Sequence, residues 1–229
     1  MNNCATVVAL VEGSTEIIFI NDLVVPHLAA AGVFMKPIIL SKPGEKGGDV
    51  KFTRAQTDIG LHLKQRSDTY LTTFVDFYGI KDWPGLEPAR QLRSSAAKAK
   101  RMNDATRQKV LELFPEQRPD KRFIPYVNVH EFESLLFSDP QKLAAHLDVN
   151  QMKVDRILTN CGSPEDINDS PDTAPSKRLE ALSEHFKKTS TGIAIARDIG
   201  LAKMREKCPL FNAWLTAMEG LKGIVHATS

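Results

Sequence analysis

Three short apolar segments of this 229-residue sequence each end in acidic residues, and this pattern constrains the fold more than any other feature. The segments are VVALVEGSTE at 7–16, FVDFYGIKDWPG at 74–85 and YVNVHEFESLLF at 126–137. In a parallel α/β sheet the carboxyl ends of the strands meet at one edge, where ligands bind. Carboxylates gathered there repel one another and shift one another's pKa unless a cation compensates them. The sequence therefore predicts a magnesium-dependent site at this edge.

The order of apolar and amphipathic segments predicts an α/β fold with a mainly parallel sheet. The apolar runs lack strict alternation, which is typical of strands buried on both faces. We expect a central four-stranded sheet flanked by helices, in which 5–11 and 70–77 are neighbours. The four strands are expected at 5–11, 36–41, 70–77 and 123–129.

The character of the sequence changes after residue 137. Amphipathic helical stretches follow one another without a convincing strand, and 163–178 is a polar, proline-rich connector. We expect two parts, an α/β core over 1–137 and a helical part over 138–229 that packs on the core.

The composition is that of a soluble globular protein, with 42% apolar and 25% charged residues. The cysteines, Cys4, Cys161 and Cys208, lack any CxxC spacing, so neither a disulfide framework nor a zinc ribbon is indicated, and a reducing cytosol fits. No apolar run reaches the roughly 18 residues that a membrane span needs. The first apolar stretch contains Glu12 and has no basic segment before it, unlike a signal peptide. We expect a cytoplasmic protein with no membrane partner.

Basic residues are concentrated over 90–122, although the formal net charge is only +2. Such a stretch either faces phosphates or forms a solvated helix face, and both readings stay open. Its members are Arg90, Arg93, Lys98, Lys100, Arg101, Arg107, Lys109, Arg118, Lys121 and Arg122.

The first two acidic segments supply three candidate metal ligands. Glu12 follows the first strand and precedes a glycine, which favours a role in metal binding. Glu16 is either a second acid of the site or a complement to the positive end of the next helix. Asp76, at the end of the third strand, is a metal ligand or a turn-forming aspartate. The metal role is favoured because Tyr78 and Gly79 already supply a turn.

The third segment supplies the tetrapeptide HEFE at 130–133. Glu131 and Glu133 share a face if the segment is extended and diverge if it is helical. Magnesium takes one or two carboxylates and keeps several waters, so one of the two suffices. His130 is either a general base or a packed histidine. The spacing is not HExxH, so a zinc protease is not indicated.

A second cationic feature follows Pro175. Ser176, Lys177 and Arg178 stand where a helix would begin, and the two cations either engage a phosphate or form a solvated face. The glycine-rich segment 42–49 does not match the GxxxxGK[ST] order of a phosphate-binding loop.

The acidic segments together resemble the Toprim fold, the catalytic core shared by topoisomerases, bacterial-type primases, recombination proteins and OLD-type nucleases. Toprim domains place a glutamate after the first strand and a DxD-type motif after a later strand. Glu12 matches the glutamate and Asp76 the first aspartate, whereas Tyr78 stands in place of the second aspartate. This departure leaves room for a carboxylate from HEFE in the metal site.

VEGSTE, VDFYG, HEFESLLF, the connector INDSPDTAPSKR and CPLFNAWL are similar to a bacterial family of unknown function in the Toprim-like group, over nearly the whole chain. Proteins of this family are similar in setting to the nuclease partners of ABC-type or AAA-type ATPases in phage defence, and the resemblance alone implies neither a substrate nor an activity. Any such ATPase would be a separate polypeptide, since this chain has no Walker motif.

The functional hypothesis is therefore a Mg²⁺- or Mn²⁺-dependent phosphoryl-transfer enzyme, a nuclease acting on DNA or RNA. The alternative is a non-catalytic binding or regulatory subunit of an ATPase complex on the same scaffold. The expected metal ligands are Glu12, Glu16, Asp76, Glu131 and Glu133, and the expected catalytic residues are Glu12, Asp76, His130, Lys177 and Arg178.

Overall fold

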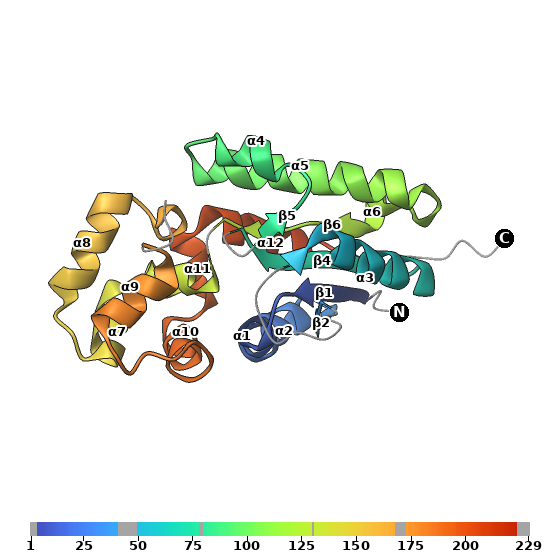
Figure 1. Ribbon diagram of the computed structural model, residues 1–229. Coiled ribbons are helices and arrows are strands. Elements are labelled where there is room, and N and C mark those ends of the chain that lie inside the picture. Colours follow the sequence, from blue (N-terminus) through green and yellow to red (C-terminus); the bar gives the residue numbers. More distant parts are fainter. Residues whose placement is uncertain (1–3, 41–49, 78–79, 130, 168–172, 224–229) are drawn as a thin grey trace.

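A parallel sheet lies between layers of helices in the computed structural model of the chain (Figure 1). Helices α1 (Ser14–Phe19) and α2 (Val25–Ala30) lie on one side of the sheet. Helices α4 (Leu86–Arg90) and α5 (Ser95–Leu113) lie on the other. The structure describes residues 4–40, 50–77, 80–129, 131–167 and 173–223.

The sheet has the strand order β2-β1-β4-β6, and a further strand, β7, also pairs with β4. Every pairing is parallel, and β1 and β4 are neighbours, so the predicted architecture is confirmed. A separate two-stranded sheet pairs β3 with β5. The strands are β1 Ala5–Val11, β2 Val33–Ile39, β3 Val50–Lys51, β4 Thr69–Asp76, β5 Ile80–Asp82, β6 Phe123–Ile124 and β7 Val127–Asn128.

The second strand begins earlier than the predicted range 36–41. Gly32, with a φ of 76°, turns the chain directly after α2, so that Val33 already pairs with Ala5 of β1. The strand ends at Ile39, and residue 41 lies outside the described residues.

The fourth strand, predicted as continuous over 123–129, is broken into β6 and β7. Pro125 lies at the break and has no N–H to donate to a ladder. Side chains of β4 replace the missing ladder bonds. The Thr72 hydroxyl donates to the Ile124 carbonyl at 2.6 Å, and the Thr73 hydroxyl accepts from the Tyr126 N–H at 3.1 Å. The sheet therefore has five strands where four were expected.

The helices of the first part cover both faces of the sheet. A π-helical segment, η1, lies between α1 and α2 and ends two residues before Pro26, which has no N–H to continue the helical hydrogen bonds. The bounds are α1 Ser14–Phe19, η1 Ile20–Val24, α2 Val25–Ala30, α3 Phe52–Gln65, α4 Leu86–Arg90, α5 Ser95–Leu113, η2 Pro115–Gln117 and α6 Pro119–Arg122.

After residue 137 the described residues form helices and no strand, as the sequence predicts. None of the helices in the described ranges is long and apolar enough to cross a membrane. The elements are η3 Phe132–Ser138, α7 Pro140–Leu147, α8 Gln151–Cys161, η4 Pro164–Asp166, α9 Pro175–Leu182, η5 Lys188–Gly192, α10 Ile193–Ile199, α11 Leu201–Lys207 and α12 Pro209–Glu219.

One hydrophobic cluster joins the sheet to the C-terminal helices. Trp214 of α12 packs edge-on against Phe74 of β4 and stacks on Tyr126, with ring centroids 5.2 Å apart in both pairs. Its indole N–H donates to the buried Thr72 hydroxyl at 3.0 Å. The two parts therefore share a core. The division between residues 137 and 138 remains a prediction, and η3 spans it.

Arg122, counted above in the basic stretch, is only 2% exposed. Its guanidinium donates to the carbonyl oxygens of Leu63, Arg66, Thr69 and Gln117. It ties the end of α3 to the start of β4, and it contributes nothing to a basic surface.

Candidate functional site

The first acidic segment lies at the carboxyl end of β1. Glu12 directly follows Val11, the last residue of the strand, and Glu16 lies in the first turn of α1 with 8% of its surface exposed. A Cβ atom on Gly13 would lie 3.3 Å from Oε2 of Glu16. The glycine therefore lets the Glu16 carboxylate lie close to the turn that follows Glu12.

Asp76 is the last residue of β4, the strand beside β1. It stands in register with Asn128, the last residue of β7. The Asn128 amide donates to Oδ1 of Asp76 at 3.4 Å, and only 2% of Asn128 is exposed. No motif in the sequence marks Asn128, because its position beside Asp76 depends on how β7 pairs with β4.

Glu131 and Glu133 stand where the chain passes from extended backbone into η3. Glu131 has extended dihedral angles and Glu133 lies in the first turn, so the segment is neither wholly extended nor wholly helical. Both carboxylates meet Lys188, the first residue of η5. The Lys188 Nζ lies 2.9 Å from Oε1 of Glu133 and 3.8 Å from Oε1 of Glu131.

The start of α9 holds the Glu131 carboxylate. The N–H of Ser176 donates to Oε2 at 2.8 Å, and the Ser176 hydroxyl donates to Oε1 at 3.0 Å. The N-terminus of a helix favours an anion, and here the anion is a side chain of the protein. The segment expected to engage a phosphate thus positions Glu131 through its serine.

The electrostatics of Asp76 bring the three acidic segments together. Its pKa lies well above the usual 3.8, first because of burial and then because of Glu16, Glu12, Glu133 and Glu131, in that order. All four glutamates therefore contribute to the negative potential at Asp76. Asp76 itself lies at the carboxyl edge of the parallel sheet, where a ligand site is expected.

The other side of the cluster is partly compensated by Lys188. Burial raises the pKa of Glu133 and Lys188 lowers it, with a net value of about 7. Burial lowers the pKa of Lys188, but Glu133 and Glu131 outweigh it and hold the pKa above 10.5. The lysine therefore stays charged among the acids, whereas Glu133 titrates near neutral pH.

Within the described ranges, no group of three or more His, Cys, Asp or Glu side chains is placed to hold a metal ion. Magnesium in proteins needs only one or two carboxylates and keeps several waters. The cluster offers hard carboxylate oxygens, which suit Mg²⁺ and Mn²⁺ rather than a metal that prefers thiolate or imidazole. The chemistry of the donors fits such a cation, and its binding remains a prediction.

The two cations named from the sequence have other partners, and their role at the site remains a prediction. Lys177 is exposed and its Nζ lies 2.7 Å from Oε2 of Glu180. The Nε of Arg178 donates to the Thr173 carbonyl at 2.9 Å. Lys188 forms ion pairs with Glu131 and Glu133. In the sequence it merely follows another lysine, and no motif marks it as a site residue. Two further positions of interest, Tyr78 and His130, lie outside the described residues.

Residues 11–219 match the family model described as "Domain of unknown function (DUF4276)". The chain belongs to the DUF4276 family. The matched range begins directly before Glu12, so it contains all five acids and Lys188. The expectation of a family of unknown function is confirmed, and its placement in the Toprim-like group remains a prediction.

No curated protein matches the chain significantly. Two solved structures, both of the C-terminal region of the Xanthomonas campestris pv. campestris OLD protein, are similar to it. The one phased with mercury is 15% identical, covers 92% of this chain and 96% of its own, and has a TM-score of 0.36. The one phased with platinum is 14% identical, covers 93% and 95%, and has the same TM-score. Similarity at this level supports no inference about function.

Proposed function

We propose that this chain is a divalent-cation-dependent phosphoryl-transfer enzyme of the Toprim type, a nuclease that acts on DNA or RNA. The observation that carries the proposal is that Glu12 and Asp76 stand at the carboxyl ends of the neighbouring parallel strands β1 and β4, where Glu16, Glu131 and Glu133 also act on the pKa of Asp76. Such a concentration of like charge destabilises the fold unless it has a function or a counter-ion. Phosphoryl-transfer sites use cations held by carboxylates, which makes this chemistry the best match.

Glu12 and Asp76 would hold the main cation, because each stands directly at or after the end of a central strand. Glu16 and one of Glu131 or Glu133 would complete the ligand set. When bound, Mg²⁺ or Mn²⁺ would polarise the scissile phosphate and lower the pKa of the attacking water. Asn128 would orient Asp76 through the bond to Oδ1.

Lys188 would balance the negative charge that develops on the phosphate oxygens, since it remains protonated beside the acids. Glu133, with a pKa of about 7, can accept or release a proton near neutral pH. Lys177 and Arg178 remain candidates for contacts with the substrate farther from the acids.

A second candidate function is a non-catalytic subunit that binds to a separate ATPase. One observation favours it: Lys188 forms ion pairs with both Glu131 and Glu133, so the protein itself supplies a cation to these two acids. Such a protein would keep the fold and the acid cluster but would not need a cation. The given sequence has no GxxxxGK[ST] motif, so these residues do not themselves supply a Walker-type ATP-binding loop.

Cleavage assays decide between these functions. Plasmid DNA, single-stranded DNA and RNA are incubated with the purified chain in Mg²⁺ or Mn²⁺. We expect cleavage that falls by about 100-fold or more in Asp76→Asn and in Glu12→Gln, because each removes a ligand charge. Asp82→Asn is the matched control, because Asp82 is an exposed acid at the end of β5. Equal cleavage by all variants would reject the assignment, and absence of cleavage by the wild type would favour the non-catalytic subunit.

A further inference from the structure

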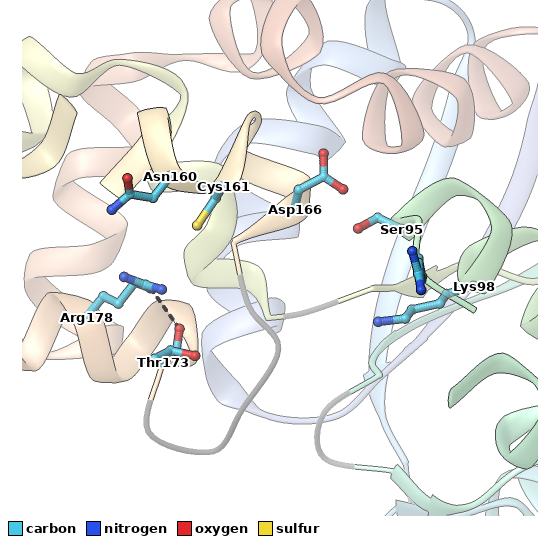
Figure 2. A pocket seen from close by; sticks show the side chains of 8 residues that line it. Ser95, Lys98, Asn160, Cys161, Asp166, Thr173 and Arg178 are labelled. Atoms are coloured by element: carbon cyan, nitrogen blue, oxygen red, sulfur yellow. Dashed lines mark hydrogen bonds between the residues drawn. The ribbon is translucent and has the colours of Figure 1, made fainter. Parts of the chain in front are cut away.

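A polar pocket of about 380 Å³ lies between the start of α5 and the C-terminal helices (Figure 2). Ser95 and Lys98 reach it from α5, and Asn160 and Asp166 lie across from them. Arg178 of α9 lies along a third side (Figure 2). The pocket therefore forms where the start of α5 meets two nearby segments of the C-terminal helices, 160–166 and 173–178.

The pocket is positively charged. Arg93, Lys98 and Arg178 line it, against the one carboxylate of Asp166. The Ser163 hydroxyl already donates to that carboxylate at 2.7 Å, which reduces its repulsion of an incoming anion. An excess of cations at a concave surface is the electrostatic signature of a site for an anion.

The geometry of the basic groups suits phosphate in particular. The bond from Nε of Arg178 to the Thr173 carbonyl fixes the plane of the guanidinium at the side of the pocket (Figure 2). A planar guanidinium pairs with two phosphate oxygens at once, whereas an ammonium acts as a point charge. Ser95 begins the 19-residue helix α5, so the positive end of that helix dipole adds to the attraction.

Two of the residues that line the pocket lie near residues of the acidic segments or of their partners. The Lys98 Nζ lies 6.0 Å from the centre of the Phe77 ring, and Phe77 directly follows Asp76. Arg178 stands two residues after Ser176, which holds the Glu131 carboxylate. A ligand that extends from the acids along the end of β4 and the start of α9 would therefore reach the pocket.

We propose that this pocket binds a backbone phosphate of a nucleic-acid strand while another phosphate of the same strand lies at the acid cluster. The placement of the other phosphate at the acid cluster rests on the proposed function, but binding at the pocket does not require a metal. A polymer with repeated phosphates fits two adjoining sites, one cationic and one acidic with a bound cation. A free phosphate or mononucleotide would occupy the pocket alone.

The test measures the binding of a fluorescent single-stranded DNA oligonucleotide in EDTA over a series of salt concentrations. Arg93→Gln and Lys98→Gln each remove one cation from the pocket. We expect about five- to tenfold weaker binding for each, and a slope of log affinity against log salt that is shallower by about 0.7. Lys98→Arg keeps the charge and retains most of the affinity.

The matched control is Lys100→Gln, since Lys100 is exposed on the same helix and pairs with Asp104 outside the pocket. It makes the same change in net charge and leaves the affinity close to that of the wild type. If the pocket variants bind the oligonucleotide as Lys100→Gln does, the proposal is overturned. Thermal melting of each variant shows that the fold is retained.

Two further outcomes separate the possible ligands and the two proposals. Inorganic phosphate could bind to the wild type as tightly as the oligonucleotide does, with this binding lost in Lys98→Gln. In that case the pocket binds a free anion and the proposal is wrong. If the pocket variants weaken binding while no protein cleaves nucleic acid in Mn²⁺, the proposed nuclease function fails and the pocket assignment stands.

Discussion

The Nζ of Lys188 lies 2.9 Å from Oε1 of Glu133, and this ion pair brings the π-helical segment η5 against the acidic segment at the start of η3. Glu133 is almost fully buried, whereas 42% of the Lys188 side chain is exposed. The lysine thus reaches the acid cluster from the solvent side. Its positive charge offsets the mutual repulsion of the carboxylates.

Replacing Lys188 with methionine is expected to destabilise the metal-free protein. Glu133 would lose its cation and remain buried, and breaking a fully buried pair costs about 3–5 kcal/mol. We expect about 1–3 kcal/mol here, because solvent screens the exposed lysine. Denaturant unfolding in EDTA measures the change.

Lys187→Met is the control for this experiment, because Lys187 is the exposed neighbour of Lys188. Added Mn²⁺ should recover more stability in Lys188→Met than in the wild type, since a bound cation replaces the lost charge. Identical unfolding curves for the two variants in EDTA would show that Lys188 does not compensate the acids.

The threonine that bridges the broken fourth strand provides a second prediction. Thr73→Val keeps the shape of the side chain but removes the bonds to the N–H and carbonyl of Tyr126. Leaving these buried groups without a partner should lower the free energy of unfolding by about 1–3 kcal/mol. Because β7 carries Asn128 beside Asp76, cleavage should also fall.

The control for the broken strand is Thr53→Val, in which the replaced threonine lies on the surface of α3. Its expected effect on unfolding is within about 0.5 kcal/mol. A Thr73→Val protein as stable as this control would mean that the hydroxyl does not hold the strand.

The third prediction concerns the pH dependence of stability. Glu165 accepts hydrogen bonds from the N–H groups of Leu210 and Phe211 at the start of α12. Burial raises its pKa and these bonds lower it, with a net value of about 6. A carboxyl group with a raised pKa binds its proton more tightly in the folded state, so its contribution to stability is lost as pH rises through this window.

Glu165→Gln should therefore abolish a decrease of about 2 kcal/mol in the free energy of unfolding between roughly pH 4 and pH 7. Urea titrations at intervals across this range, on the wild type and the variant, give the difference. Glu184→Gln serves as the control, because Glu184 is an exposed glutamate. A difference between wild type and Glu165→Gln that stays constant with pH would contradict the raised pKa.

The central strands were predictable from the sequence because they are buried on both faces. ATVVALV at 5–11 and the run ending at Asp76 have few polar residues, and strands of this kind stand next to one another in a parallel sheet. The break in the fourth strand was not predictable, although the sequence contains Pro125. Its pairing depends on the Thr72 and Thr73 hydroxyls, and no local pattern signals that a threonine replaces a ladder bond.

The same contrast holds at the candidate site. Glu12 and Asp76 were singled out because residues that follow parallel strands meet at one edge. Asn128 and Lys188 were missed because their positions depend on long-range packing. The lysine contacts Glu131 and Glu133 because η5 packs against η3. This packing is a property of the tertiary fold, and no residue spacing in the sequence predicts it.

Binding of Mn²⁺ to the wild type and to Asp76→Asn, measured by isothermal titration calorimetry, tests the central claim most directly. We predict that the wild type binds with a dissociation constant of about 1 mM or tighter, and that Asp76→Asn weakens binding about tenfold or more, because magnesium-type sites depend on one or two carboxylates. Asp82→Asn should bind as the wild type does. No binding to the wild type in the millimolar range, or equal binding by Asp76→Asn, would contradict the metal site.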